Sequence, residues 1–477
     1  MTVRTRFAPS PTGYMHIGNL RTALYAYLAA RHYGGKFILR IEDTDQERNV
    51  PEAVAAIYKG LEMAGLEYDE GPDKDGGYGP YVQSERLDLY KMYAEQLLGT
   101  GAAFRCFCKR EETGQEESEP TRRDPCRLLS EDEMRARVNA GESFVIRQKI
   151  PDIGSTTFED RVYGEITIEN AQLDDQVLLK SDGFPTYNFA NVVDDHLMGI
   201  THVMRGQEYL SSTPKYNLLY EAFGWPIPIY VHLPLILKAD GSKFSKRLGD
   251  PSFEDLVNMG YLPEAIINYI ALLGWSPGDD QELFTLAELE KVFNIDRISK
   301  SGAAFSFDKL TWINGEHIRA LSVDVFHTLA EQYYPEELSK YDTRKISALL
   351  QVRTEKLIDI PQSVAFFVSV PEYDASMYHH DKSKSTLESS LAVLRAVLPL
   401  LKTLTSWDND SLFQALSSFG KEQGYKIGTV MWPIRTALSG VFATPGGATA
   451  LAEILGKEET LQRIEAGINI LESTLGK

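Results

Sequence analysis

Cysteines and long apolar runs are both scarce in this sequence. Three cysteines in 477 residues are too few to staple a secreted scaffold, and their odd number leaves no complete pairing. No run approaches roughly 18 consecutive apolar residues, the length expected of a membrane-spanning helix. The N-terminus, with Arg4, Arg6, Pro9 and Pro11, lacks the apolar core of a signal peptide. We therefore expect a soluble cytoplasmic protein that does not contact a membrane.

Positive charge is also in short supply. The 49 lysines and arginines are outnumbered by 68 aspartates and glutamates, which leaves a net charge of −19 and argues against a uniformly basic nucleic-acid surface. Any contact with nucleic acid must therefore use local patches, and residues 1–48 are a candidate because seven basic and four acidic residues give them a net +3. The length predicts about three domain cores at roughly 100–200 residues each.

The first 41 residues show the pattern of a strand, a loop, a helix and a second strand. Residues 3–8 alternate as a strand does, 19–33 have helical periodicity, and 36–41 favour another strand. Such a βαβ unit implies a parallel pair of strands with a ligand crevice at their carboxyl ends. Further helices are predicted at 51–64 and 84–98.

The pattern changes after the second of these helices. Residues 109–125 are almost wholly polar, and 143–168 are strand-like with glycine and proline turns, which indicates an inserted module. A sheet pattern returns over 203–237, and helical spacing dominates from about Pro263 onward. We expect an α/β fold: a Rossmann-type domain with an α/β insertion, followed by an all-α C-terminal region.

The loop after the first strand carries the sequence PSPTGYMHIGN at positions 9–19. A helix N-terminus offers unpaired N–H groups and partial positive charge, Gly18 allows close backbone approach, and His16 can donate to a phosphate. Together these features suit a nucleoside triphosphate. On this loop alone, a Pro/Gly turn with one surface histidine remains an equal alternative.

A second cationic loop follows the last predicted strand. Its sequence KFSKR places Lys243, Lys246 and Arg247 within five residues beside Gly241. Taken alone, such a run is more often a solvated basic loop. A His-x-Gly loop followed more than 200 residues later by a Lys-x-Ser-Lys loop, however, resembles the paired motifs of class I aminoacyl-tRNA synthetases.

Longer segments carry the resemblance over nearly the whole chain. The sequence resembles the bacterial-type glutamyl-tRNA synthetases in RFAPSPTGYMHIGN, LRIEDTD, GPYVQSER, LLKSDGFPTYNFANVVDDHLMGITHVMRGQEYL, KFSKR and IGTVMWPIRTALSGVFATPG. The resemblance implies a catalytic Rossmann-type domain at 1–80 and 196–240, split by an acceptor-stem-binding insertion at 81–195. It further implies a stem-contact region with a KMSKS-like loop at 241–322 and an α-helical anticodon-binding region at 323–477.

That family activates glutamate with ATP to form glutamyl-adenylate and then transfers the glutamyl group to its tRNA, releasing pyrophosphate and AMP. A free carboxylate, with a reference pKa near 4, is already ionised at pH 7 and needs no general base. Catalysis then requires positioning and neutralisation of phosphate charge, which Mg²⁺ would share. The resemblance assigns catalysis to His16, Gly18, Lys243 and Lys246, and contacts with ATP to His16, Gly18, Asn19, Glu208 and Lys246. Asn19 stands where the family's HIGH motif ends in histidine.

An anionic substrate side chain in a partly dry pocket should meet a guanidinium, whose planar fork binds a carboxylate through two hydrogen bonds. Arg6 and Arg205 are the candidates. Without the resemblance, a structural ion pair between Arg6 and Glu42 would be the more common arrangement. The resemblance assigns glutamate binding to Arg6, Ser10, Glu42, Tyr187, Asn191 and Arg205.

The expected partners are tRNA(Glu), L-glutamate and ATP. Single-stranded anticodon bases would be read by stacking and edge hydrogen bonds in the helical region. Arg353 matches a position at which an arginine of this family helps to distinguish glutamate from glutamine anticodons, although a surface arginine of no special role fits equally well. The resemblance also suggests a monomer.

Three cysteines, Cys106, Cys108 and Cys126, are similar to a zinc knuckle of some relatives. Structural zinc almost always has four protein ligands, and those relatives place the fourth two residues after the third cysteine, where this chain has Leu128. The sequence therefore favours free thiols and no metal site.

Two other functions share parts of this pattern. The same fold could charge glutamine, or place glutamate on a glutamine tRNA, although two candidate arginines favour an acidic substrate. A small-molecule nucleotidyltransferase would share the His-x-Gly chemistry, but the helical last third, which lacks evident catalytic residues, argues against it.

Overall fold

The computed structural model describes residues 2–11, 15–44, 51–108, 124–244 and 249–476. The chain divides into a first unit, Met1–Val257 with Pro263–Leu310, and a second unit, Asn258–Leu262 with Thr311–Lys477. Among the described residues, no helix is both long enough and apolar enough to cross a membrane.

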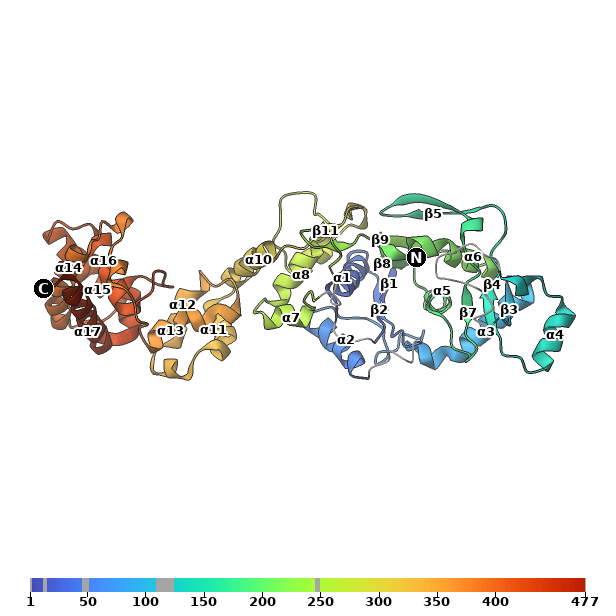
Figure 1. Cartoon of the computed structure of the whole chain (residues 1–477), viewed down its shortest axis with the longest axis horizontal. Helices are drawn as coiled ribbons and strands as arrows, with labels where there is room; N and C mark the ends of the chain where they lie inside the picture. The colour runs from blue at the N-terminus through green and yellow to red at the C-terminus, as the bar shows by residue number, and fades with distance from the viewer. Residues whose placement is uncertain (1, 12–14, 45–50, 109–123, 245–248, 477) are drawn as a thin grey trace. The chain divides into compact units, whose positions relative to one another are not determined.

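The first unit begins with the βαβ arrangement that the sequence predicts (Figure 1). Strand β1, Arg4–Phe7, runs parallel to β2, Lys36–Leu39, and helix α1, Ile17–His32, connects them. Helix α1 is buried along most of its length because apolar residues occur around its whole circumference. The loop between β1 and α1 therefore brings the N-terminus of a buried helix to the carboxyl end of a strand.

A second parallel pair of strands extends the Rossmann-type arrangement. Strand β8, His202–Gly206, pairs with β9, Ile229–Leu233, and helix α6, Thr213–Phe223, lies between them in the chain. Thr201 joins the two pairs, because its amide donates to the carbonyl of Arg4 and its carbonyl accepts from the amide of Ile229, both at 2.9 Å. The carboxyl ends of β1 and β8 therefore lie side by side.

The region of the predicted insertion does not form one separate sheet. Strands β3, β4 and β7 form a three-stranded antiparallel sheet. Strands β5 and β6 form a hairpin, and the end of β5 pairs in parallel with β9 through Asp160 and Tyr230. This hairpin extends the sheet of the nucleotide fold in the order β6-β5-β9-β8. The bounds are β3 Ala103–Cys106, β4 Val145–Gln148, β5 Ser155–Asp160, β6 Gly164–Glu169 and β7 Val177–Leu179, with helices α3 Leu87–Thr100, α4 Glu131–Asn139 and α5 Tyr187–Leu197.

Short elements complete the first unit. Strand β10 pairs in parallel with β11, which places residues near 303 beside the strand that precedes the second cationic loop. These elements are α2 Pro51–Met63, β10 Ile236–Leu237, α7 Phe253–Asn258, α8 Pro263–Ala271, α9 Leu286–Val292 and β11 Ala303–Ala304; the division between the units falls within α10, Phe307–Ala320.

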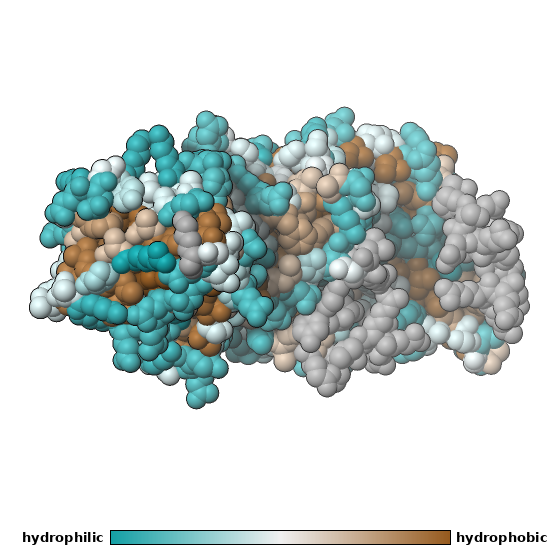
Figure 2. All heavy atoms as spheres, turned by 60° about the vertical axis from the view of Figure 1, so that its left-hand side comes forward, coloured by the Kyte–Doolittle hydropathy of each residue, from teal (hydrophilic) through white to brown (hydrophobic). Residues whose placement is uncertain are grey.

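The second unit is helical, as the sequence predicts for the last third. Helix α14 buries Leu391, Leu394, Val397 and Leu401 along one face, the spacing that packs one helix against others. Figure 2 shows this end of the chain with mostly hydrophilic surface around smaller hydrophobic areas. The helices are α11 Val323–Ala330, α12 Thr343–Gln351, α13 Ile360–Val368, α14 Leu387–Thr403, α15 Asn409–Glu422, α16 Ile427–Ser439 and α17 Ala448–Leu475, the last kinked at Gly456.

Candidate active site

A cavity of about 1000 Å³ opens where the loop after β1, the start of α1 and the ends of β8 and β9 meet. Its position at the carboxyl ends of parallel strands is where ligands bind in open α/β sheets. Most residues that the sequence singled out line it. They are Arg6, Ser10, His16, Gly18, Asn19, Glu42, Tyr187, Arg205, Glu208 and Lys243.

Three predicted residues do not line this cavity in the described chain. Asn191 is buried one turn along α5, where its Nδ2 donates to the carbonyl of Tyr187 at 2.7 Å. Arg353 lies exposed in the second unit. Lys246 falls outside the described residues.

Helix α1 presents its N-terminus to the cavity. His16 precedes the helix, and its Nδ1 accepts a hydrogen bond from the amide of Gly18 at 2.9 Å. Nδ1 is therefore the unprotonated ring nitrogen, and Nε2 carries the hydrogen. A Cβ at position 18 would lie only 3.1 Å from Nδ1, so glycine leaves room for this contact. The helix amides and the donor Nε2 together suit an anion.

The second cationic loop reaches the same cavity. Lys243 is exposed and contributes to the lining. The next residue, Phe244, is buried, with its ring 6.2 Å from that of His16 and stacked on Phe305 at 4.6 Å. Two motifs that lie far apart in the sequence therefore meet in the structure.

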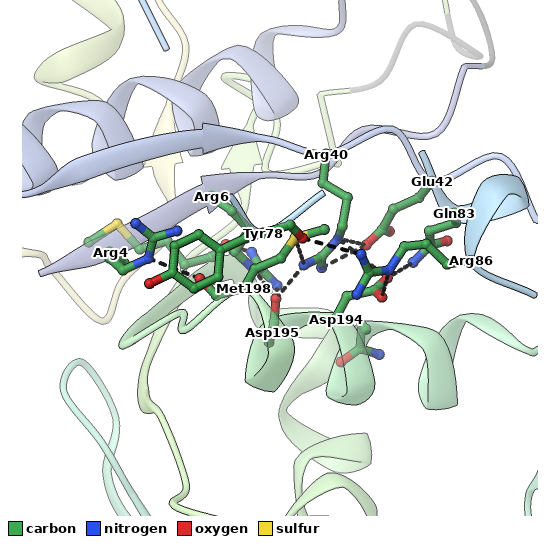
Figure 3. Close-up of polar contacts among 12 residues, drawn as sticks. Arg4, Arg6, Arg40, Glu42, Tyr78, Gln83, Arg86, Asp194, Asp195 and Met198 are labelled. Carbon is green, nitrogen blue, oxygen red and sulfur yellow. Dashed lines mark hydrogen bonds and ion pairs between the residues drawn. The ribbon is translucent and has the colours of Figure 1, made fainter. Parts of the chain in front are cut away.

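Arg6 and Arg40 share one buried carboxylate (Figure 3). Nε of Arg6 donates to Oδ1 of Asp195 at 3.0 Å, and Nη1 of Arg40 donates to the same oxygen at 2.8 Å. Arg40 also contacts Oε1 of Glu42 through Nη2 at 3.0 Å. Arg6 is therefore paired within the protein, but its partner is Asp195 rather than the Glu42 that the sequence suggested as an alternative.

The two carboxylates of this network have opposite pKa shifts. Burial alone would raise the pKa of Asp195, but the charges of Arg6 and Arg40 outweigh burial and hold that pKa below its ordinary value. Burial dominates at Glu42, whose pKa is raised even though Arg40 and Arg6 act to lower it. Asp195 therefore remains charged at neutral pH. Glu42 takes up a proton at a higher pH than an ordinary glutamate does.

Sequence reasoning missed the support around the neighbouring Asp194. Its carboxylate accepts from Nε of Arg86 at 2.7 Å, from Nε2 of Gln83 at 2.9 Å, and from the hydroxyl of Tyr90. These partners anchor helix α5, and with it Asp195, to the start of α3. Two adjacent aspartates directly after Val192 and Val193 are the sequence signal that could have pointed to this network.

Arg205 sits in a different environment. Its Nε donates to Nε2 of His232 at 3.0 Å, and its Nη2 donates to Oγ1 of Thr213 at 2.8 Å. The rings of Tyr216 and Tyr209 lie 4.6 and 5.3 Å from its guanidinium carbon. Within the described part of the chain Arg205 makes no ion pair, although its side chain is buried, so its charge remains available to an anionic ligand.

Arg21 is a further buried arginine of the lining that the sequence did not single out. Its guanidinium donates to the carbonyls of Leu273, at 3.0 Å, and Pro234. Burial lowers its pKa. These bonds tie α1 to the segments on either side of the second cationic loop.

The three cysteines form a cluster with one carboxylate. Donor atoms of Cys106, Cys108, Asp124 and Cys126 all lie within 4.8 Å of one another. The thiol of Cys106 donates to Oδ2 of Asp124 at 2.9 Å. A fourth donor is therefore present, so the missing ligand on which the expectation of free thiols rested is supplied by Asp124. Three thiolates and a carboxylate fit tetrahedral zinc, and a metal held by all four would be structural.

The predicted anticodon residue lies near a second arginine of its own unit. Burial lowers the pKa of Arg435, and repulsion from Arg353 lowers it further. The Arg435 guanidinium packs 4.3 Å from the ring centre of Trp432, and Phe442 beside it is 64% exposed. This surface therefore combines cationic and aromatic side chains.

Comparison with known proteins matches both units. Residues 2–312 match the family described as tRNA synthetases class I (E and Q), catalytic domain, and residues 325–468 match an anticodon binding domain. The chain is 56% identical to the glutamate–tRNA ligase of Clostridium botulinum strain Hall over 479 residues, covering 99% of each protein, and 53% identical to that of Clostridium tetani, covering 100% of this chain and 99% of the relative.

Solved structures give the same result. The crystal structure of a glutamate tRNA ligase from Elizabethkingia meningosepticum, in complex with its amino acid, is 36% identical with a TM-score of 0.87 and covers 99% of this chain and 100% of its own. The glutamate-tRNA synthetase from Elizabethkingia anophelis has the same TM-score at 35% identity, covering 98% and 100%. The chain therefore belongs to the class I tRNA synthetases (E and Q) and, within them, to the glutamate–tRNA ligase family.

Proposed function

We propose that this protein ligates L-glutamate to tRNA(Glu) for protein synthesis, with ATP as the energy source and glutamyl-adenylate as the intermediate. The observation that carries the proposal is the buried guanidinium of Arg205, which has no ion-pair partner among the described residues and lines the same cavity as the start of α1. The same cavity therefore contains a cation that suits a carboxylate and a helix start that suits phosphates, and the reaction must bring an amino acid and a nucleotide together.

The first step joins the amino acid to the nucleotide. An oxygen of the glutamate α-carboxylate attacks the α-phosphorus of ATP, and the bond to the bridging oxygen breaks to release pyrophosphate. The α1 amides, Nε2 of His16 and the ammonium of Lys243 stabilise the negative charge on the phosphates. Asn19, Glu208 and Lys246 complete the ATP site on the strength of the sequence, and Mg²⁺ supplies further charge neutralisation to the triphosphate when bound.

Glutamate recognition uses a second set of residues of the same cavity. Arg205 binds the side-chain carboxylate through its guanidinium, Glu42 accepts from the substrate ammonium, and Ser10, Tyr187 and Arg6 complete the walls. Asn191 acts through Tyr187, whose backbone it already contacts. Glutamine is rejected because its amide would leave the charge of Arg205 buried and unpaired.

The second step uses the tRNA. A hydroxyl of its terminal ribose attacks the glutamyl carbonyl carbon, and AMP leaves with the phosphate oxygen. The second unit reads the anticodon, with Arg353 on a cationic and aromatic surface that suits single-stranded bases. No step is assigned to zinc, because Cys106, Cys108, Asp124 and Cys126 lie outside the cavity lining. We further propose a cytoplasmic monomer.

Aminoacylation assays with purified glutamate and glutamine tRNAs, each supplied with both amino acids, test this function. We expect glutamate on tRNA(Glu) and no transfer of glutamine. Transfer of glutamine at a comparable kcat/KM would overturn the assignment of glutamate as the substrate. Transfer of glutamate to the glutamine tRNA as well would add a second tRNA substrate but would not change the proposed reaction.

A further inference from the structure

We propose that His232 and Asp160 form a positioning relay that fixes the Arg205 guanidinium for the substrate carboxylate, with His232 held neutral in one tautomer. The inference rests on the proposed role of Arg205 in binding glutamate. Neither His232 nor Asp160 lines the cavity, so both act through Arg205 and not on the substrate.

The hydrogen bonds define the tautomer. Arginine has no acceptor atom, so the 3.0 Å contact between Nε of Arg205 and Nε2 of His232 requires a lone pair on Nε2. The ring hydrogen therefore sits on Nδ1, which donates to Oδ2 of Asp160 at 2.6 Å. A hydrogen on Nε2 would oppose the Arg205 donor directly.

Asp160 is itself fixed by the backbone. One carboxylate oxygen accepts from the amides of Val162 and Tyr163, both at 2.9 Å, and the other accepts from the amide of His232 at 3.1 Å. All of these donors need an acceptor, so the carboxylate cannot rotate without losing several bonds. Asp160 ends β5 and pairs with Tyr230 of β9, so the hairpin between the two halves of the nucleotide fold supports the substrate site.

The atoms in direct contact with the Arg205 guanidinium are neutral, so among the described residues no carboxylate pairs with it. A carboxylate placed against this guanidinium would orient it equally well but would also neutralise it, and would compete with the acidic side chain of the substrate. An imidazole acceptor at Nε and the hydroxyl of Thr213 at Nη2 fix the plane of the fork, while the Asp160 carboxylate stays on the far side of the His232 ring and does not contact the guanidinium. Burial lowers the pKa of His232, which favours this neutral form.

Two substitutions at position 232 separate the acceptor from the rest of the ring. Asparagine reaches the position of Nδ1 and can contact Asp160, but it does not reach Arg205. Glutamine reaches the position of Nε2 and can offer its oxygen to Arg205. We expect His232→Asn to raise the KM for glutamate by about tenfold, the effect of one lost buried hydrogen bond, with the KM for ATP changed less than twofold, and His232→Gln to restore most of the loss.

Tyr230→Phe is the matched control on the same strand. It removes the buried hydrogen bond from the Tyr230 hydroxyl to Asn217, at 2.8 Å, but keeps the ring that packs on Arg205. We expect its KM for glutamate to match wild type. An equal rise of both KM values in His232→Asn, or a rise in the control as large as in His232→Asn, would show a structural role and overturn the relay.

The outcomes distinguish this inference from the proposed function. If Arg205→Ala raises the KM for glutamate and His232→Asn does not, the relay fails while the function stands; if the wild-type protein does not charge glutamate, the function fails first. A second measurement uses the wild-type protein alone and so does not depend on whether a variant folds: the ¹⁵N chemical shifts of the His232 ring report which nitrogen carries the hydrogen. A protonated Nδ1 and an unprotonated Nε2 support the relay, and the opposite pattern or a doubly protonated ring at pH 7 would refute it.

Discussion

Two buried arginines of one cavity, Arg6 and Arg205, are held in opposite ways. Arg6 shares the carboxylate of Asp195 with Arg40, so its charge is balanced inside the protein. Arg205 is held by neutral acceptors and aromatic rings, and within the described chain it has no anionic partner. Residues that look equivalent in the sequence therefore differ in how their charge is balanced: that of Arg6 is paired inside the protein, and that of Arg205 has no ion-pair partner in the described chain.

The largest expected effect is a loss of stability when the ion pairs of Arg6 and Arg40 with Asp195 are broken. Asp195→Ala leaves two buried guanidiniums without their shared carboxylate, which we expect to lower the free energy of unfolding of the first unit by about 3–5 kcal/mol. Denaturant unfolding followed by a probe within that unit measures the loss. Glu282→Ala, which breaks a largely solvent-exposed contact with Lys309 in the same unit, is the control and should cost less than about 1 kcal/mol. A similar loss in both variants would contradict the comparison.

Substitution of Arg205 should change the kinetics of aminoacylation more than the stability of the protein. We expect Arg205→Ala to reduce kcat/KM for glutamate by about 10²–10³-fold, mainly through KM, because the substrate carboxylate loses its charged partner. The KM for ATP should change far less. Steady-state aminoacylation assays measure the KM values for glutamate and ATP. The midpoint temperature of thermal unfolding should fall less in Arg205→Ala than in Asp195→Ala. Equal effects on glutamate and ATP would reject the assignment.

The pH dependence of glutamate binding separates the two carboxylates of the network. Because burial raises the pKa of Glu42, lowering the pH protonates Glu42 above the range of an ordinary carboxyl group, and its attraction for the substrate ammonium is lost. The lowered pKa of Asp195 keeps that group charged over the same range. We therefore expect the KM for glutamate to rise toward acidic pH in the wild-type protein.

Glu42→Gln provides the matching variant. Its KM for glutamate should be about tenfold higher at neutral pH, the effect of losing a charged hydrogen-bond partner, and should depend little on pH. The KM for ATP, measured in the same buffers, is the control. An identical pH profile in the two proteins would show that another group titrates.

The smallest expected effect concerns the aromatic support of Arg205. Tyr216→Leu removes the ring that lies 4.6 Å from the guanidinium and should raise the KM for glutamate about two- to fivefold, as expected for a contact worth about 0.5–1 kcal/mol. Tyr216→Phe keeps the ring and removes the hydroxyl with its hydrogen bonds to Asn188 and Ser212. A larger effect of phenylalanine than of leucine would assign the role to the hydroxyl instead.

Local patterns predicted the elements that build the cavity. Alternation predicted β1, a short strand-like run predicted β2, helical periodicity predicted α1 and the last helices, and the two motif loops indicated the chemistry. Local patterns could not predict contacts between residues that are far apart in the sequence. Three such contacts are the pairing of β5 with β9, the ion pair of Arg6 with Asp195, and the approach of Asp124 to Cys106. Each joins segments whose spacing along the chain does not predict that they meet.

The sequence by itself determined the class of the protein. Its motifs can be recognised from the order of residues alone, because their residues act through backbone and side-chain groups that are neighbours in the chain. His16 with Gly18 is such a motif, since three consecutive positions form the contact. Only the tertiary structure decided which buried charges are balanced and which are free. That distinction depends on the side chains that folding brings within hydrogen-bonding distance, and for Arg6 and Arg205 those partners lie on other strands and helices.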